Sequence, residues 1–212
     1  MYESLVNSVI AETSGAPTEL IKSCLLRTCR DFAKHTGVVN ETFAVPIVEG
    51  QEDYNLGLPE GFHLGVVEAV EVKREGHLGR HLRPYSAFAP SPNRTMSPMY
   101  RVKSFADPAT VSFSGVIRSD PADPHIAHIR ARLVPTDLEA LSGEVFTVYE
   151  DALRIGTLSM LYRVPNRPWT APAYAAQAAR SYIGLRSQAR QQRARGGSQN
   201  PYPTTTPKVT ER

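Results

Sequence analysis

Hydrophobic positions at the start of the chain recur with helical spacing. Apolar residues share one side of residues 2–12, and the sequence Ser14-Gly15-Ala16-Pro17 then interrupts the pattern. The next apolar stripe, with spacings of three and four, consists of Ile21, Cys24, Leu25, Thr28 and Phe32. Such spacing places every member on one face of a helix. Proline is favoured in the first turn of a helix and glycine just beyond its end, so we expect a second helix between Pro17 and Gly37.

The period of the hydrophobic pattern changes to two from about residue 40. Residues 127, 129, 131 and 133 are apolar, and the residues between them are His128, Arg130 and Arg132. This alternation is typical of a strand with one buried face. Similar short runs fill residues 39–141, interrupted by a proline-rich loop over residues 84–98. The segment therefore predicts an inserted antiparallel β-domain that is either a sandwich or a barrel-like sheet.

Helical spacing returns near Ser142, which we expect to be the N-cap of one helix that ends before Pro165. The small residues Gly156 and Ser159 on its apolar stripe would let a neighbouring helix approach closely. A last helix follows near Pro172, and we expect its buried face to consist of Tyr174, Ala175, Ala178, Ala179, Tyr182 and Leu185.

These patterns together predict an α+β fold. Residues 1–38 and 142–196 would form one discontinuous helical bundle, because the apolar stripe at each chain end needs a partner to cover it. The β-domain of residues 39–141 would be inserted between the two halves. Residues 197–212, rich in Gly, Ser, Asn, Pro and Thr, would form an extended C-terminal tail.

The distribution of charge says more about partners than the overall composition does. The 212 residues carry a net charge of +3, but residues 152–212 hold ten Lys and Arg residues against one acidic residue, Glu211. That segment is therefore at about +9 and residues 1–151 at about −6. We expect the basic end to bind an acidic protein surface or a phosphate backbone. A solvated helical face that only keeps this end soluble is the alternative.

The candidate partner-binding residues at the basic end are Arg186, Arg190, Arg193, Arg195, Tyr202, Lys208 and Arg212. Tyr202 lies between two prolines, which favours an extended segment that a partner groove could capture.

The sequence contains few candidates for catalytic chemistry. We find no glycine-rich phosphate loop that opens a helix and no Gly-x-Ser-x-Gly motif. His125 and His128 would lie on opposite faces of a strand, so a shared metal is not expected. Cys24 and Cys29 are too far apart around a helix to pair, which favours buried thiols in a reducing compartment. We therefore expect neither enzymatic activity nor a cofactor.

Targeting signals are not evident in the sequence. The first residues lack a basic segment followed by an apolar run, and no apolar stretch approaches the ~18 residues that would span a bilayer. We expect a protein that is made in a cytoplasm and does not associate with a membrane.

A succession of short motifs resembles a known family. The motifs are Ser14-Gly15-Ala16-Pro17, then Arg30-Asp31-Phe32-Ala33-Lys34-His35-Thr36, Gly50-Gln51-Glu52-Asp53-Tyr54-Asn55-Leu56, Leu58-Pro59-Glu60-Gly61, the helical run from Tyr149 to Tyr162, and Pro165-Asn166-Arg167-Pro168-Trp169. Their order over about residues 1–195 resembles the tailed-phage head-to-tail adaptors, also called tail tubular protein A in short-tailed phages. The chain departs from that family at Gly37-Val38-Val39, where its members often carry an aromatic residue.

The resemblance implies a structural virion protein at the head–tail junction of a bacteriophage. Such adaptors form a ring, commonly of about twelve copies, closed by head-to-tail contacts between subunits. The expected partners are other copies of the chain, the portal protein, the tail nozzle or tube protein and, through non-specific contact, the DNA in the channel. The alternative hypothesis is a DNA-binding accessory protein that uses the arginines from Arg186 to Arg195. A carbohydrate-binding or hydrolytic tail component would need a groove of aromatic residues and carboxylates, and the chain has one tryptophan.

Overall fold

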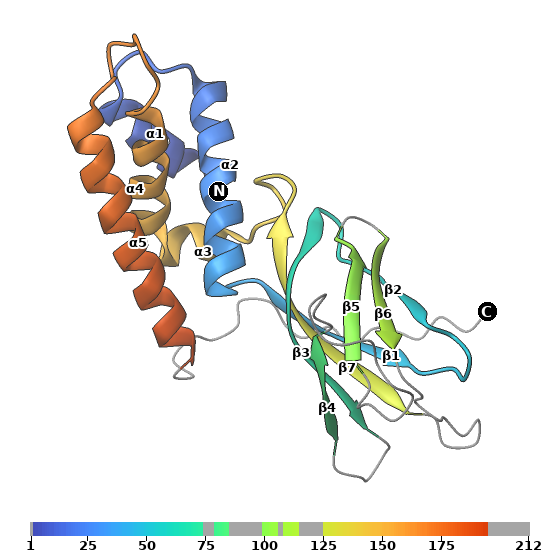
Figure 1. Ribbon diagram of the computed structural model, residues 1–212. Helices are drawn as coiled ribbons and strands as arrows, with labels where there is room; N and C mark the ends of the chain where they lie inside the picture. Colours follow the sequence, from blue (N-terminus) through green and yellow to red (C-terminus); the bar gives the residue numbers. More distant parts are fainter. Residues whose placement is uncertain (1, 74–78, 85–98, 106–107, 115–124, 195–212) are drawn as a thin grey trace. The chain divides into compact units, whose positions relative to one another are not determined.

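The computed structural model of the chain describes residues 2–73, 79–84, 99–105, 108–114 and 125–194 (Figure 1). The helices are α1 (Glu3–Glu12), α2 (Thr18–Thr36), α3 (Gly143–Val148), α4 (Glu150–Leu161) and α5 (Pro172–Ala194). The strands are β1 (Asn40–Pro46), β2 (Asp53–Leu56), β3 (Phe62–Lys73), β4 (Arg80–Pro84), β5 (Met99–Ser104), β6 (Ala109–Ser114) and β7 (Ile126–Pro135).

The chain folds into two compact units, which we call the helical unit and the sheet unit. The helical unit contains residues 2–39, 60–62 and 134–194 of the described chain, and the sheet unit contains residues 40–59 together with the described residues between 63 and 133. Of the predicted loop over residues 84–98, the structure describes only Pro84, which is the last residue of β4; the rest of that loop and the predicted tail over residues 197–212 lie outside the described residues.

The fold class predicted from the sequence is wrong. The β-strands form one seven-stranded sheet in the order β1-β7-β3-β4-β5-β6-β2, and β1 contacts β2, so the sheet is a nearly closed barrel. It is not purely antiparallel, because β4 and β5 run parallel. The helices are likewise not a bundle built from the chain ends alone, since residues 60–62 and 134–142 belong to the same unit. Alternation shows which face of a strand is buried but not which strand lies beside it.

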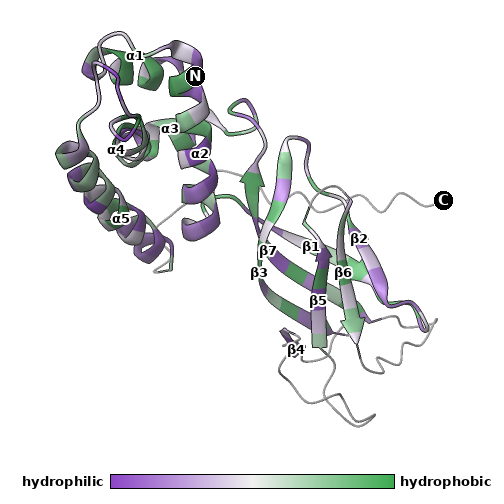
Figure 2. Ribbon diagram, turned by 45° about the horizontal axis from the view of Figure 1, so that its top comes forward, coloured by the Kyte–Doolittle hydropathy of each residue, from purple (hydrophilic) through white to green (hydrophobic). Residues whose placement is uncertain are grey.

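The interior of the sheet unit follows the alternation of the strands (Figure 2). In β7 the residues Ala127, Ile129, Ala131 and Leu133 are all buried, as predicted, whereas Arg130 is exposed. Phe43 of β1 lies opposite Ile129 in the antiparallel register and is also buried. Neighbouring strands thus contribute apolar side chains to one common core.

Helix α2 forms the centre of the helical unit, where it contacts α1, α4 and α5. The predicted stripe from Ile21 to Phe32 is buried along its whole length. Pro17 precedes the helix in an extended conformation, and Gly37 ends it with a φ of 66° while its N–H donates to the Ala33 carbonyl. A left-handed residue at this position favours glycine, so the predicted ends of this helix are confirmed.

The predicted single helix from Ser142 is two helices, α3 and α4, separated at Tyr149. Tyr149 has φ and ψ of −114° and 23°, outside the helical region, and its ring lies 4.9 Å from the ring of Phe32 on α2. Nothing in the local sequence forbids a continuous helix here. We attribute the break to the packing of the Tyr149 ring against α2, a contact between residues far apart in the sequence.

Fewer residues of helix α5 are buried than its sequence predicts. Its buried residues are Ala175, Tyr182 and Ala189, which are spaced by seven. Tyr174 was expected on the buried face but is 67% exposed. This narrow contact surface is enough to hold α5 against α4, because Gly156 of α4 lets the two helices approach closely. A Cβ placed at Gly156 would lie 2.5 Å from Cγ2 of Thr28 and 2.9 Å from Cδ2 of Tyr182.

Candidate partner-binding surfaces

The basic helix α5 is fastened to α2 by a cluster around the carboxylate of Asp31. Oδ2 of Asp31 accepts hydrogen bonds from Nη1 of Arg186 at 2.6 Å and from the hydroxyl of Tyr182 at 2.7 Å. On the other side, Nδ1 of His35 lies 3.2 Å from Oδ1. The guanidinium carbon of Arg186 also lies 5.6 Å from the centre of the Tyr182 ring, which adds a cation–π contact.

The same cluster changes the acidity of Tyr182. Burial, and after it the hydrogen bond to Asp31, raise the pKa of Tyr182 above its ordinary value of 10. Ionisation of this phenol would place a second negative charge next to Asp31. Tyr182 therefore remains a hydrogen-bond donor at neutral pH.

Arg193 is a second arginine of α5 that contacts α2. Its Nη1 donates to the backbone carbonyl of Thr36 at 3.3 Å. Thr36 is the last residue of α2, where the carbonyl groups have no partner within the helix and the helix dipole favours a cation. Arg186 and Arg193, both predicted to bind a partner, thus serve to hold two helices of this chain together.

Of the predicted partner-binding residues that the structure describes, Arg190 alone is exposed without an ion pair. Arg195, Tyr202, Lys208 and Arg212 lie outside the described residues. Arg190 lies on the side of α5 that also carries Arg180 and Ile183, since these residues fall within about 80° of one another around the helix. Ile183 is 52% exposed. We call Arg180, Ile183 and Arg190 the outer face of α5.

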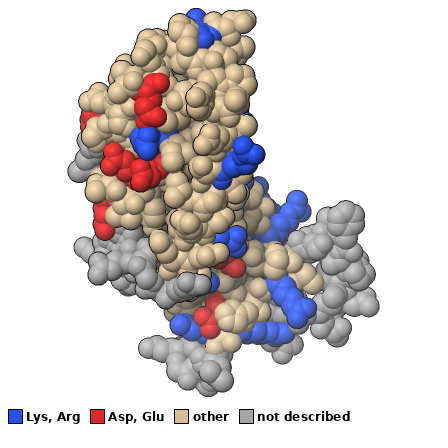
Figure 3. All heavy atoms as spheres, turned by 90° about the vertical axis from the view of Figure 1, so that its left-hand side faces the viewer, with Lys and Arg blue, Asp and Glu red and all other residues tan. Residues whose placement is uncertain are grey.

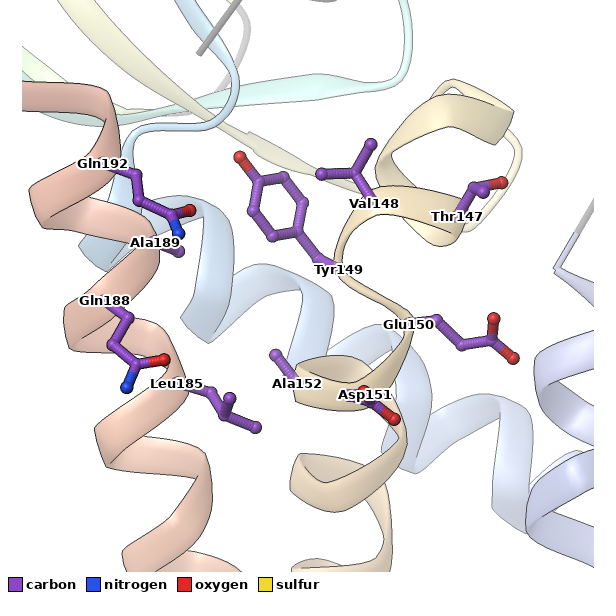
Figure 4. Close-up of a pocket in the computed structure, with 10 residues that line it drawn as sticks. All are labelled: Thr147, Val148, Tyr149, Glu150, Asp151, Ala152, Leu185, Gln188, Ala189 and Gln192. Carbon is purple, nitrogen blue, oxygen red and sulfur yellow. The ribbon is translucent and has the colours of Figure 1, made fainter. Parts of the chain in front are cut away.

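An open groove of about 330 Å³ lies on the opposite side of α5, between that helix and the junction of α3 with α4 (Figure 4). Its lining consists of Thr147, Val148, Tyr149, Glu150, Asp151, Ala152, Leu185, Gln188, Ala189 and Gln192. Figure 4 shows Tyr149 projecting between α5 and Val148, with Gln188 and Leu185 extending from α5 toward α4. Val148, an apolar residue, is 61% exposed at the edge of this groove.

The α4 side of the groove is acidic. Glu150 and Asp151 are both exposed, and Asp151 has only a long contact of 3.4 Å to Arg154, which also pairs with Glu12. Figure 3 shows acidic side chains gathered on one side of the helical unit. Sequence analysis missed this groove because it expected an unbroken helix through Tyr149. The available signal in the sequence was the run Val148-Tyr149-Glu150-Asp151, in which two apolar residues precede two carboxylates.

Several motifs of the family resemblance form the connections of the fold. In the segment between α4 and α5, Asn166 has a φ of 57°, and the hydroxyl of Thr170 donates to the Val164 carbonyl and accepts from the N–H of Arg167. The hydroxyl of Tyr54 bonds to three backbone groups of residues 48 and 51. These hydrogen bonds hold the loops in their conformation.

The other candidates for chemistry considered from the sequence are histidine and cysteine side chains. Within the described ranges, no three His, Cys, Asp or Glu side chains are placed to hold a metal ion. Burial, and after it the charge of Lys73, lower the pKa of His128, which favours the neutral imidazole. Cys24 and Cys29 are free and buried. None of the described helices combines the length and apolar character needed to cross a membrane.

Comparison with the models of known protein families and with curated proteins finds no match to this chain. The functional interpretation therefore depends on the geometry above and on the motif order of the sequence.

Proposed function

We propose that this protein is a structural head-to-tail adaptor, which forms a ring between the portal and the tail nozzle or tube of a bacteriophage and continues the DNA channel. The proposal combines the motif order with the surfaces of the helical unit. A ring in which each copy contacts the next requires two different and complementary patches on every subunit.

The observation that carries the proposal is the pair of opposite surfaces on the two sides of α5. On one side the groove presents Glu150 and Asp151 around an exposed Val148. On the other side the outer face presents Arg180 and Arg190 around an exposed Ile183. The mean direction of the groove-lining residues of α5 differs from that of Arg190 by about 150° around the helix. Each patch therefore has an apolar centre and charges that complement the other patch.

The alternative of a DNA-binding accessory protein that uses the arginines of α5 has less support. Arg186 and Arg193 are engaged with Asp31 and Thr36 of the same chain. Releasing either arginine to a phosphate would leave a partly buried carboxylate or the end of α2 without its partner. Arg190 remains for such contacts, together with Arg195 outside the described residues.

Charge inversion tests the proposed ring contact. The outer-face variant Arg180→Glu/Arg190→Glu and the groove variant Glu150→Arg/Asp151→Arg are each expected to abolish assembly with the portal protein. An equimolar mixture of the two variants is expected to assemble again, because every acidic patch then meets a basic one. Electron microscopy of particles and sedimentation would detect the rings.

The proposal fails if wild-type protein remains monomeric with and without portal protein, or if the single variants assemble normally. Truncation after Gly196 separately tests the C-terminal segment, and it is expected to block attachment to the portal while the melting temperature is unchanged. A truncated protein that still joins portals would remove the role of that segment alone.

A further inference from the structure

The outer surface of the sheet unit carries a row of cations that is not apparent from the net charge of the sequence. Leu82 of β4 and Tyr100 of β5 are buried in the core of the sheet. Since side chains alternate along a strand, their neighbours face outward. The outward cations of β4 and β5 are Arg83, Arg101 and Lys103, and all three are exposed. We call these three residues the outer row.

The register of the sheet places the members of the outer row side by side. Arg83 is the partner of Met99 in the parallel pair β4·β5, so Arg83 and Arg101 belong to the same face of adjacent strands. Strands lie about 4.8 Å apart and residues two positions apart on a strand are separated by about 6.8 Å. Arg83 and Arg101 therefore lie about 8 Å apart. Lys103 follows Arg101 at the position where the β5·β6 register shifts, between Val102 and Ser104.

Most of this positive charge is not neutralised by the protein. Lys103 pairs with Asp53 at 2.7 Å, and hydrogen bonds from Lys103 and Ser112 lower the pKa of that carboxyl. Arg83 and Arg101 have no ion-pair partner, a statement limited to the residues that the structure describes. Two arginines that are left in solvent beside each other repel, so an anionic partner would stabilise them.

The form of the outer row indicates what kind of anion it suits. A small anion is bound by donors that converge on one point, whereas these cations are spread along a surface. An exposed hydroxyl lies beside them, because Ser114 is opposite Met99 in the β5·β6 pair, whereas Ser112, opposite Arg101, is buried. Arginine and serine are typical contacts of phosphate oxygens in nucleic acids. The outward residues of β4 and β5 include His81 but no Phe, Tyr or Trp, so stacking on single-stranded bases has little support.

We propose that the outer row of Arg83, Arg101 and Lys103 docks the phosphate backbone of duplex DNA without reading its sequence. This surface is separate from the basic end of the chain and does not require ring formation. In a ring that continues a DNA channel, it would provide weak contacts that depend on salt, since few phosphates are neutralised by each copy.

Binding of a fluorescent 30-base-pair DNA duplex of random sequence, measured by anisotropy at several salt concentrations, tests the proposal. The variant Arg83→Gln/Arg101→Gln is expected to bind at least about tenfold more weakly at low salt, and its log–log salt slope is expected to fall by about two. The matched control is Arg163→Gln/Arg167→Gln, which removes the same charge from exposed positions of the helical unit and is expected to bind like the wild type.

Four results would overturn the proposal. They are no binding by the wild type, equal losses in both double variants, loss of binding only on truncation after Gly196, and displacement of DNA by polyglutamate as readily as by unlabelled DNA. The last result would indicate an acidic polypeptide as the partner. Assembly with portal protein is measured on the wild type as well. Intact assembly without DNA binding contradicts this inference alone, and DNA binding without assembly contradicts the adaptor alone.

Discussion

Arg186 on α5 and Asp31 on α2 are 155 positions apart in the sequence and lie 2.6 Å from each other in the structure. The contact is only partly exposed, with 22% of the arginine side chain and 34% of the aspartate side chain accessible. It is reinforced by the hydroxyl of Tyr182 on the same carboxylate oxygen. The basic C-terminal region predicted to bind a partner thus contributes, in part, to holding α5 against α2 of the same chain.

Removing the Asp31 carboxylate is expected to destabilise the helical unit. Asp31→Ala leaves Arg186 and Tyr182 without their acceptor, and we expect a loss of about 1–3 kcal/mol in the free energy of unfolding. Chemical denaturation followed by circular dichroism measures it. Glu19→Ala is the control, because it removes an exposed carboxylate in the first turn of the same helix that pairs with Lys22, and a loss of only about 0.5 kcal/mol is expected. Equal stabilities of the two variants would contradict the role of the cluster.

Two glycines in helices offer a matched test of close packing. Gly156→Ala would place a methyl group 2.5 Å from Cγ2 of Thr28, so we expect a loss of about 1–3 kcal/mol in stability. Gly184→Ala meets nothing within 4 Å on α5 and is expected to stabilise by about 0.5–1 kcal/mol through helix propensity. Thermal melts measure the change in stability of both variants. An increase in the stability of Gly156→Ala would contradict the close packing of α4 against α2 and α5.

Alkaline pH is expected to unfold the helical unit partly through Tyr182. Its pKa is higher in the folded protein than in the unfolded chain, so the folded state favours the protonated phenol. This contribution to stability is complete below about pH 10 and is lost as the pH rises above it, by up to about 1.4 kcal/mol per pH unit. Tyr182→Phe is expected to be less stable at neutral pH but to lose less stability above pH 10.

The control for the alkaline experiment is Tyr174→Phe, which changes a tyrosine whose side chain is 67% exposed. Its stability is expected to follow that of the wild type over the whole pH range. If Tyr182→Phe and the wild type lost stability in parallel above pH 10, the phenol would not be linked to folding.

Cys29 is expected to report on global opening of the helical unit. Burial raises its pKa to about 12 and the residue is only 2% exposed. Because the thiolate is the reactive form, iodoacetamide at pH 8 should leave Cys29 unmodified in the native protein and modify it in denaturant. Peptide mass spectrometry distinguishes it from Cys24. Rapid alkylation of Cys29 in the native protein would show that this part of α2 is not packed as described.

Features that depend on neighbouring residues could be predicted from the sequence. The stripe of α2, its glycine end at Gly37 and the alternation of β7 are local periodicities, and the structure has them where they were expected. The architecture was predicted less well, because no local pattern determines that β4 and β5 pair in parallel or that β1 pairs with β7 and β2 with β6.

The candidate partner-binding surfaces also divide into features that the sequence predicts and features that only the tertiary structure shows. The sequence identified a basic C-terminal region, but charge alone does not distinguish an arginine that binds a partner from one that binds its own chain. The groove at Tyr149 and the outer row at Arg83 and Arg101 were missed, since each consists of residues from different elements.

By itself the sequence determined where helices and strands form, which of their faces are apolar and where the net charge lies, because these properties depend on spacings of two to four residues and on composition. Only the tertiary structure decided that Arg186 and Arg193 hold α5 to α2, that the helix breaks at Tyr149, and that Arg83 and Arg101 face solvent side by side. Each of these outcomes depends on a contact between segments that are distant in the chain. Such a contact stabilises the protein only after folding has brought the two segments together.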